Sequence, residues 1–286
     1  FKRSQYVGDN LDYCVFNQKT ENRWELKDLL GFIANDDERT FVDMPNGQKI
    51  HFYPTNKIRI PVDKNVVIKN KVINSKYNDS IVPYIDVDIK GRALYKNRLM
   101  MFDIINNNNW ERPICFTGGS FSDEDYLWMK DYLQLQGLVY KLVPVKTPID
   151  EENAPMDMGT IDSDAMYEIV MKWDWGNGDS KTIYHDPETR KNSISYRTNM
   201  ARLMEQLINE GKLDKAKEII DLAMDKMPME YYGFYTMVEP FAGGYYEVGE
   251  KEKARIILSK LIKKYQENLT YFTGLKTSEQ NDMAVE

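Results

Sequence analysis

The sequence EGKLDKAKEII at residues 210–220 recurs as VGEKEKARIIL at residues 248–258, and this repeat decides the fold of the C-terminal part. The offset is 38 residues at every aligned position. In the first copy, Gly211 ends one helix, a lysine-rich corner follows, and the small Ala216 allows the second helix to pack closely. The spacing therefore predicts two helical hairpins over residues 193–269.

This repeat resembles the tetratricopeptide pattern, including Pro228 after the second helix, although 38 residues exceed the usual ~34. Two units are fewer than the three or so that stand alone, so we expect them to pack against the rest of the chain. Stacked hairpins expose a concave face made by the first helix of each unit, here residues 193–209 and 238–248. A peptide-binding groove on that face requires Tyr196 and Asn199 to be at least partly exposed.

The N-terminal half alternates between strand and helix patterns. We expect a helix at residues 24–33, a hairpin at residues 41–52, and strands at residues 57–62, 66–68 and 81–89. We then expect a helix from Arg92, with one face formed by Leu94, Arg98, Met101, Phe102 and Ile105. A strand at residues 113–117 should follow it. A second helix should run from the capping box at residues 122–125 to Gln136, with a strand after it at residues 138–145. Helix, strand, helix, strand over residues 92–145 predicts an α/β unit with mainly parallel pairing.

The predicted fold class is α/β followed by all-α: a small mixed α/β domain plus tetratricopeptide-like helical hairpins. Four parts are expected along the chain. They are an α/β domain at residues 1–150, a connector with a short helix and a tryptophan-rich loop at residues 151–192, the helical repeats at residues 193–272, and a mobile tail at residues 273–286. Residues 147–160 have little periodicity and are expected to form a linker or a surface excursion.

Composition excludes several classes of protein. The chain has 286 residues, about twice the ~150 of a typical domain, with 42% apolar and 29% charged residues, which argues against a mainly disordered chain. Its 38 basic and 45 acidic residues give a net charge of −7, and no dense Lys/Arg run suggests a nucleic-acid partner. Neither a dinucleotide-binding nor a Walker spacing occurs, so no cofactor is expected.

Cysteine and histidine usage argues against a metal or a disulfide scaffold. Cys14 and Cys115 either form one bridge in an oxidising compartment or are two buried thiols. With only two histidines in the chain, no zinc site is expected. No apolar stretch approaches the ~20 residues that span a bilayer, and no signal peptide is visible. Because the chain begins with Phe1, we expect an excised piece or a processed product with any anchor upstream.

Carboxylates offer the candidates for catalysis. Asp86 and Asp88 share one face of a strand, where they either bind a divalent cation or simply face solvent. Asp86 with Asp88, or Glu111 with Asp123, would serve glycoside hydrolysis if the two acids faced each other across about 5–10 Å. Nothing in the sequence singles out either pair.

Aromatic residues offer the binding candidates. Trp173, Trp175 and Tyr184 either form a platform for a sugar ring or anchor the core. Together with Tyr196 and Asn199 they are the candidate binding residues. We expect the loop that carries the two tryptophans to cover the groove. If it buries both Tyr196 and Asn199, the repeats are scaffolding.

Two segments carry a family resemblance. DIIN at residues 103–106 followed by NNWERPICF at residues 108–116 resembles a signature of the domain of unknown function 2723 family, which are Bacteroidetes membrane proteins related to protein O-mannosyltransferases. A second block of that family is similar to Trp175-Gly176-Asn177, then Tyr184 and Asp186, then Ala201-Arg202-Leu203. The resemblance runs from about Tyr6 to Leu269.

In that family the N-terminal half is a bundle of membrane helices, and the resemblance implies that the catalytic acid lies in an early extracytoplasmic loop of that half. No catalytic residue is therefore carried over to this sequence. The resemblance implies a C-terminal domain on the periplasmic face of the inner membrane. Its partners would be the upstream membrane helices of the same protein and a protein or glycan acceptor. We expect a non-catalytic accessory domain that positions this acceptor for a glycosyltransferase-like partner. The alternatives are a freestanding peptide-binding repeat protein and a carboxylate-dependent glycoside-active enzyme.

Overall fold

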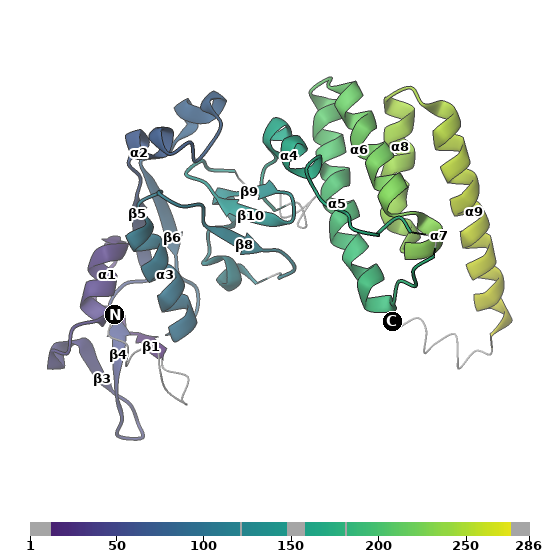
Figure 1. The fold of residues 1–286 in the computed structure, drawn as a ribbon. Helices are drawn as coiled ribbons and strands as arrows, with labels where there is room; N and C mark the ends of the chain where they lie inside the picture. The colour runs from purple at the N-terminus through teal and green to yellow at the C-terminus, as the bar shows by residue number, and fades with distance from the viewer. Residues whose placement is uncertain (1–12, 121, 148–157, 181, 276–286) are drawn as a thin grey trace. The chain divides into compact units, whose positions relative to one another are not determined.

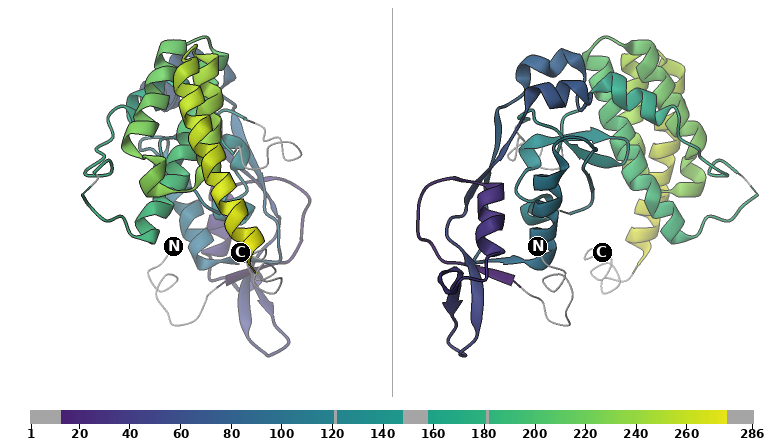
Figure 2. Two further views of the ribbon diagram at one scale, coloured as in Figure 1. Left: turned by 90° about the vertical axis from the view of Figure 1, so that its right-hand side faces the viewer. Right: turned by 60° about the vertical axis from the view of Figure 1, so that its left-hand side comes forward.

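The computed structural model describes residues 13–120, 122–147, 158–180 and 182–275. Their contacts divide the chain into two compact units, shown in Figures 1 and 2. The first unit comprises the described residues of Phe1–Leu135 and Val139–Thr160, and the second those of Gln136–Leu138 and Ile161–Glu286. The first contains small sheets with helices and the second is built of helices, which confirms the predicted class of α/β followed by all-α.

Three small sheets form the frame of the first unit. One has the order β3-β4-β1-β7, with β3 at Phe41–Asp43, β4 at Lys49–Tyr53, β1 at Tyr13–Phe16 and β7 at Ala93–Tyr95. Another has the order β2-β5-β6, with β2 at Trp24–Glu25, β5 at Lys57–Pro61 and β6 at Tyr84–Asp88. The last has the order β8-β10-β9, with β8 at Cys115–Thr117, β10 at Val139–Leu142 and β9 at Leu133–Gln136.

Helices α1, at Leu26–Ile33, and α3, at Lys96–Asn108, contact each other and bury their apolar faces in one core. In α1 the buried residues recur at helical spacing, as the sequence predicts: Leu26, Leu29, Leu30 and Ile33. The predicted hairpin at residues 41–52 is also confirmed, since β3 and β4 pair antiparallel around a turn that contains Gly47. The alternating strands β5 and β6 are present and pair antiparallel.

The predictions for residues 66–68 and for Leu94 are wrong. Residues 66–68 lie in helix α2, Lys64–Lys69, because the Asp63 carboxylate caps its first turn by accepting from the main-chain nitrogens of Asn65 and Val66. Leu94 is not helical, since it pairs with Cys14 in the β1–β7 ladder. Helix α3 therefore begins at Lys96 and runs into the asparagine stretch, ending at Asn108.

The predicted helix at residues 122–136 is also wrong. The segment forms the short 3-10 helices Asp123–Tyr126 and Lys130–Tyr132, followed by β9. Leu127 and Trp128 have φ values of 51° and 56°, which an α-helix does not tolerate. The expected parallel pairing over residues 92–145 is wrong as well, because β10 runs antiparallel to β8.

The second unit consists of α4 and two helix pairs, which lie side by side in Figures 1 and 2. The helices are α4 at Ser163–Val170, α5 at Pro187–Asn209, α6 at Leu213–Lys226, the single turn α7 at Met229–Tyr232, α8 at Glu239–Glu247 and α9 at Lys251–Gly274. The pairs α5–α6 and α8–α9 carry the repeated sequence. Gly211 and Gly249 turn the corners at φ values of 72° and 83°, and Ala216 and Ala254 are fully buried.

Arg197 joins the first helix pair to the segment that follows it. Its side chain is fully buried and donates to the main-chain oxygens of Met227 and Gly233, each at 2.7 Å. Burial lowers the pKa of Arg197 to about 10, so the guanidinium stays charged at neutral pH. The helix α6 thus ends against a fixed cation, which complements the free carbonyls of a helix C-terminus.

Several sequence expectations concern the chain ends and the cysteines. None of the helices in the described ranges is long and apolar enough to cross a membrane.

Cys14 and Cys115 are both free thiols. Cys14 is buried but Cys115 is exposed, so the expectation of two buried thiols is wrong for Cys115. Most of the expected linker, residues 148–157, and residues 276–286 of the expected tail lie outside the described residues. Thr273 is helical, within α9.

Candidate functional site

Three of the predicted aromatic residues form one cluster in the second unit. The Trp173 and Trp175 rings lie 5.5 Å apart, and Tyr196 of α5 contacts them at 5.1 and 5.5 Å. All three side chains are half-buried. Tyr184 does not join them in any ring contact within the described residues and is 80% exposed. The structure therefore brings together Trp173, Trp175 and Tyr196 but not Tyr184.

Asn199 does not face a groove. It is 9% exposed and donates through Nδ2 to the main-chain oxygen of Gly137 at 2.8 Å. A Cβ atom at Gly137 would lie 3.2 Å from the Trp173 ring, so Trp173 packs on the same glycine. The exposure that a peptide-binding groove requires is thus not met at Asn199, whose amide satisfies a buried carbonyl, whereas Tyr196 keeps part of its surface exposed.

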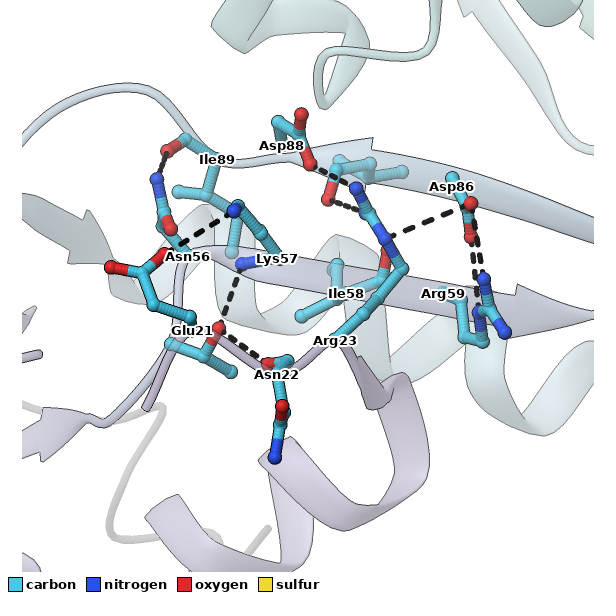
Figure 3. A network of polar contacts seen from close by, with 12 residues as sticks. Glu21, Asn22, Arg23, Asn56, Lys57, Ile58, Arg59, Asp86, Asp88 and Ile89 are labelled. Atoms are coloured by element: carbon cyan, nitrogen blue, oxygen red, sulfur yellow. Dashed lines mark hydrogen bonds and ion pairs between the residues drawn. The ribbon is translucent and has the colours of Figure 1, made fainter. Parts of the chain in front are cut away.

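Asp86 and Asp88 of the first unit are held by arginines (Figure 3). Arg23 donates to Asp88 Oδ1 at 2.6 Å and to the main-chain oxygens of Ile58 and Val87 at 2.8 and 3.0 Å. Arg59 forms a two-pronged contact with Asp86 at 3.1 and 3.2 Å. The two carboxylates are therefore neutralised across β5 and β6. Among the described residues, no group of three His, Cys, Asp or Glu side chains is placed to hold a metal ion.

Glu111 and Asp123, the second candidate acid pair, lie in different surroundings. Asp123 forms ion pairs with Lys130 at 2.8 Å and Lys90 at 3.1 Å, and the hydrogen bond from Lys130 lowers the pKa of Asp123 despite partial burial. Glu111 is exposed in the turn after α3. Asp123 thus resembles a structural ion-pair partner more than an acid or base.

A cavity of about 210 Å³, here called the asparagine pocket, lies at the carboxyl end of α3. Its polar lining comes from Glu25, Lys27, Asn106, Asn108 and Asn109. Its apolar lining comes from Ile60, Pro61, Ile105, Trp110, Ile114 and Leu142. Every lining residue belongs to the first unit. The pocket was not predicted as a site, although most of the asparagine–tryptophan stretch that lines it is part of the segment that carries the family resemblance.

The turn that shapes this pocket has an unusual backbone. Asn109 and Trp110 have φ values of 44° and 57°, a region that bulky residues rarely occupy. Two asparagines hold the turn: Asn108 Nδ2 donates to the main-chain oxygen of Arg112 at 2.9 Å, and Asn70 Nδ2 donates to that of Trp110 at 3.0 Å. Such conformations persist only where the surroundings fix them, and they concentrate at functional sites.

Several polar groups of the asparagine pocket are not used by the fold. Within the described residues, the side chains of Lys27, Asn106 and Asn109 make no hydrogen bond or ion pair. The hydrogen bond with Asp86 raises the pKa of the Arg59 guanidinium, and the Glu25 carboxylate lies close enough to contribute to this rise. The pocket therefore presents two free amides, an ammonium and a carboxylate beside an apolar wall.

A second cavity, of about 390 Å³, is lined by residues that satisfy one another. Arg98 forms ion pairs with Asp125 and with Glu124, and Ser120 donates to Asp125. The Ser120 hydrogen bond, followed by that of Arg98, lowers the pKa of Asp125. Because its charged groups are already paired, this cavity is a weaker candidate for ligand binding than the asparagine pocket.

Comparison with known proteins places this first unit in a family. A model of the family described as TMEM260-associated domain 2 matches residues 1–165. The match contains the whole first unit, which ends at Thr160, and every residue that lines the asparagine pocket. The aromatic cluster lies beyond it. No curated protein and no solved structure matches the chain.

Proposed function

Because the chain belongs to the family of the TMEM260-associated domain 2, we propose that it is a non-catalytic accessory domain of a membrane-embedded, glycosyltransferase-like protein. Its role is to position a protein or glycan acceptor, and its partners are the upstream membrane helices of the same protein. It acts on the periplasmic face of the inner membrane. The relation to the domain of unknown function 2723 family and to tetratricopeptide repeats is part of this proposal. The observation that carries it is the family match over the complete first unit.

The pKa shifts of the described carboxyl groups single out none of them as a general acid. A glycoside-active enzyme needs one acid whose pKa is raised so that it carries a proton near neutral pH. Every described carboxyl group whose pKa departs from its ordinary value has it lowered, through cations or hydrogen bonds. These groups are Asp37, Asp123, Asp125, Asp164, Asp179, Asp186, Glu210 and Glu267. With lowered pKa values these carboxylates stay ionised near neutral pH, where they stabilise the fold through ion pairs and hydrogen bonds.

The second candidate is a freestanding peptide-binding repeat protein. It is favoured by the two helix pairs of the second unit and by the partly exposed Tyr196. It is weakened by Asn199, whose amide is committed to Gly137.

The gene upstream of the codon for Phe1 separates these candidates. Membrane helices encoded in frame support the accessory role, whereas a secretion signal alone supports the freestanding protein and contradicts the accessory role. Protease treatment of spheroplasts then tests the side of the membrane. Cleavage of this domain in intact spheroplasts supports the periplasmic face, and cleavage only after lysis contradicts it.

A further inference from the structure

We propose that the asparagine pocket binds one neutral sugar ring of the acceptor glycan. This inference deepens the accessory role proposed above and rests on it, because it names the ligand class and the site. It is carried by the cavity, its free amides and the fixed Trp110.

The size of the pocket fits one ring. Its volume of about 210 Å³ is below the ~300–1,000 Å³ of sites for drug-sized ligands. A single pyranose is a ligand of this smaller size class. The glycan would therefore enter with one terminal or branching residue.

The polar lining fits hydroxyl groups. Each side-chain amide offers two donors and an acceptor, and each sugar hydroxyl both donates and accepts. Asn106 and Asn109 have this full capacity available within the described residues, and Asn108 uses one donor on Arg112 and keeps its acceptor oxygen. Vicinal hydroxyls spaced along a ring would find paired partners on these neighbouring amides.

The apolar lining fits the C–H face of a ring. Trp110 is half-buried, packs on two hydrophobic clusters and is fixed by Asn70. Ile60 and Ile105 continue the apolar wall beside it. An amphipathic ligand with one polar edge and one apolar face matches this arrangement better than a fully polar ion does.

Charge argues against the other small ligands. The Glu25 carboxylate and the Lys27 ammonium both line the pocket, so an anion or a cation would be attracted by one of them and repelled by the other. Together they contribute no net charge. The pair therefore gives no net attraction to an ion of either sign, and the free amides and the apolar wall are left to favour an uncharged polyol.

Saturation-transfer difference NMR on the 286-residue chain tests the site. The probes are the methyl glycosides of glucose, galactose, mannose and N-acetylglucosamine, with N-acetyl-phenylalanine amide as a peptide-like comparison. At least one glycoside should bind with a dissociation constant on the order of 1 mM, as expected for a ligand of this size. Asn106→Ala should weaken that binding about five- to tenfold, because one amide contact is lost.

Asn107→Ala is the matched control. Asn107 lies next to Asn106 in α3, but its amide bonds back to Asp103 and it does not line the pocket. Its substitution should leave the affinity unchanged within about twofold. Because both variants alter the same helical turn, a loss of affinity confined to Asn106→Ala cannot come from the helix alone.

Three results would overturn the proposal. The first is that no glycoside binds, and the second is that Asn106→Ala and Asn107→Ala weaken glycoside affinity equally. The third is saturation transfer to N-acetyl-phenylalanine amide alone. Glycoside binding that is lost in Trp175→Ala and kept in Asn106→Ala would move the sugar site to the aromatic cluster. Membrane helices upstream of Phe1 together with any of these results would leave the accessory role intact and reject only this site.

Discussion

Asn70 donates through Nδ2 to the main-chain oxygen of Trp110 at 3.0 Å, and so ties the end of α2 to the left-handed turn after α3. The bond joins residues 40 positions apart in the chain. It fixes the aromatic wall of the asparagine pocket without lining the pocket itself. The backbone conformation of Trp110 is thus maintained from a neighbouring element.

Asn70→Ala should therefore act on both stability and binding. We expect the free energy of unfolding to fall by about 1 kcal/mol, the usual contribution of one hydrogen bond. Glycoside affinity should fall as well, because Trp110 is no longer held. Urea titration and the NMR titration measure the two effects. Lys69→Ala, on the exposed side of α2, is the control, and an equal loss of affinity in both variants would contradict the role of Asn70.

Arg23 and Arg59 provide a test of what Asp86 and Asp88 do. Arg23→Ala removes a cation and the donors to two main-chain oxygens, so unfolding free energy should fall by about 2 kcal/mol. Arg59→Ala removes a more exposed pair with Asp86 and a contact with the Tyr84 ring, and should cost about 1 kcal/mol or less. Chemical denaturation measures both, and an equal loss would refute the structural role assigned to Arg23.

Substitution of two adjacent glycines in α8 by alanine should change the stability of the protein in opposite directions. A Cβ atom at Gly244 would collide with Met204 Sδ and lie 3.1 Å from Ile220, so Gly244→Ala should cost about 1–3 kcal/mol through overpacking between α5, α6 and α8. Gly243 has open space at the same position, and Gly243→Ala should stabilise the helix by about 0.5–1 kcal/mol. Thermal unfolding followed by circular dichroism compares them. Similar changes in both variants would show that α8 is packed differently.

Asp164 gives a pH dependence with a defined sign. Hydrogen bonds from Lys212, then Lys215, lower the pKa of Asp164 from its ordinary 3.8 to about 2. The lowered pKa means that the pair stabilises the folded state above about pH 4 and loses this contribution as the pH falls toward 2. Because the side chain is 44% exposed, solvent screening limits the contribution to about 1 kcal/mol or less.

Asp164→Asn should therefore lower the free energy of unfolding at pH 6 and leave it unchanged at pH 2. Urea titrations across this range measure the difference. Asp43→Asn, on the exposed side of β3, is the control and should leave the free energy of unfolding unchanged across this pH range. A difference between wild type and Asp164→Asn that persists at pH 2 would exclude the ion pairs as its cause.

The helical repeats could be predicted from sequence because their determinants are local. Each corner has a glycine with positive φ, and each second helix has a small residue, Ala216 or Ala254, at the tight contact. Helical spacing and these two residue types are visible in one stretch of sequence. The repeat predicts too late a start for α5, because Asp186 and Pro187 form a cap and first turn that the repeat does not include.

The errors in the first unit have tertiary causes. Three β-branched residues at 66–68 favour a strand locally, but Asp63 caps a helix there. The acidic stretch after Ser122 imitates a capping box, yet Ser122 makes no such bond. Its acids pair instead with Lys90, Arg98 and Lys130. A local pattern cannot show that these carboxylates form ion pairs with lysines and arginines elsewhere in the sequence.

The asparagine pocket could be predicted only in part. The asparagine and tryptophan residues after α3 are contiguous, so the stretch itself is conspicuous. Glu25, Lys27 and Ile60 come from elements far away in sequence, and only the packing of α3 beside β5 and the start of α1 creates the cavity. The aromatic cluster shows the same limit, because Tyr184 is close to Trp175 in sequence but stays exposed.

One proton NMR time course can show whether the chain binds glycosides without cleaving them. The chain is incubated with the glycoside panel near neutral pH, and both saturation transfer and the anomeric signals are followed over a day. We expect saturation transfer that depends on Asn106 and anomeric signals that do not change. Release of free sugar that grows with time and disappears in Asp86→Asn, Asp88→Asn or Glu111→Gln would contradict this expectation.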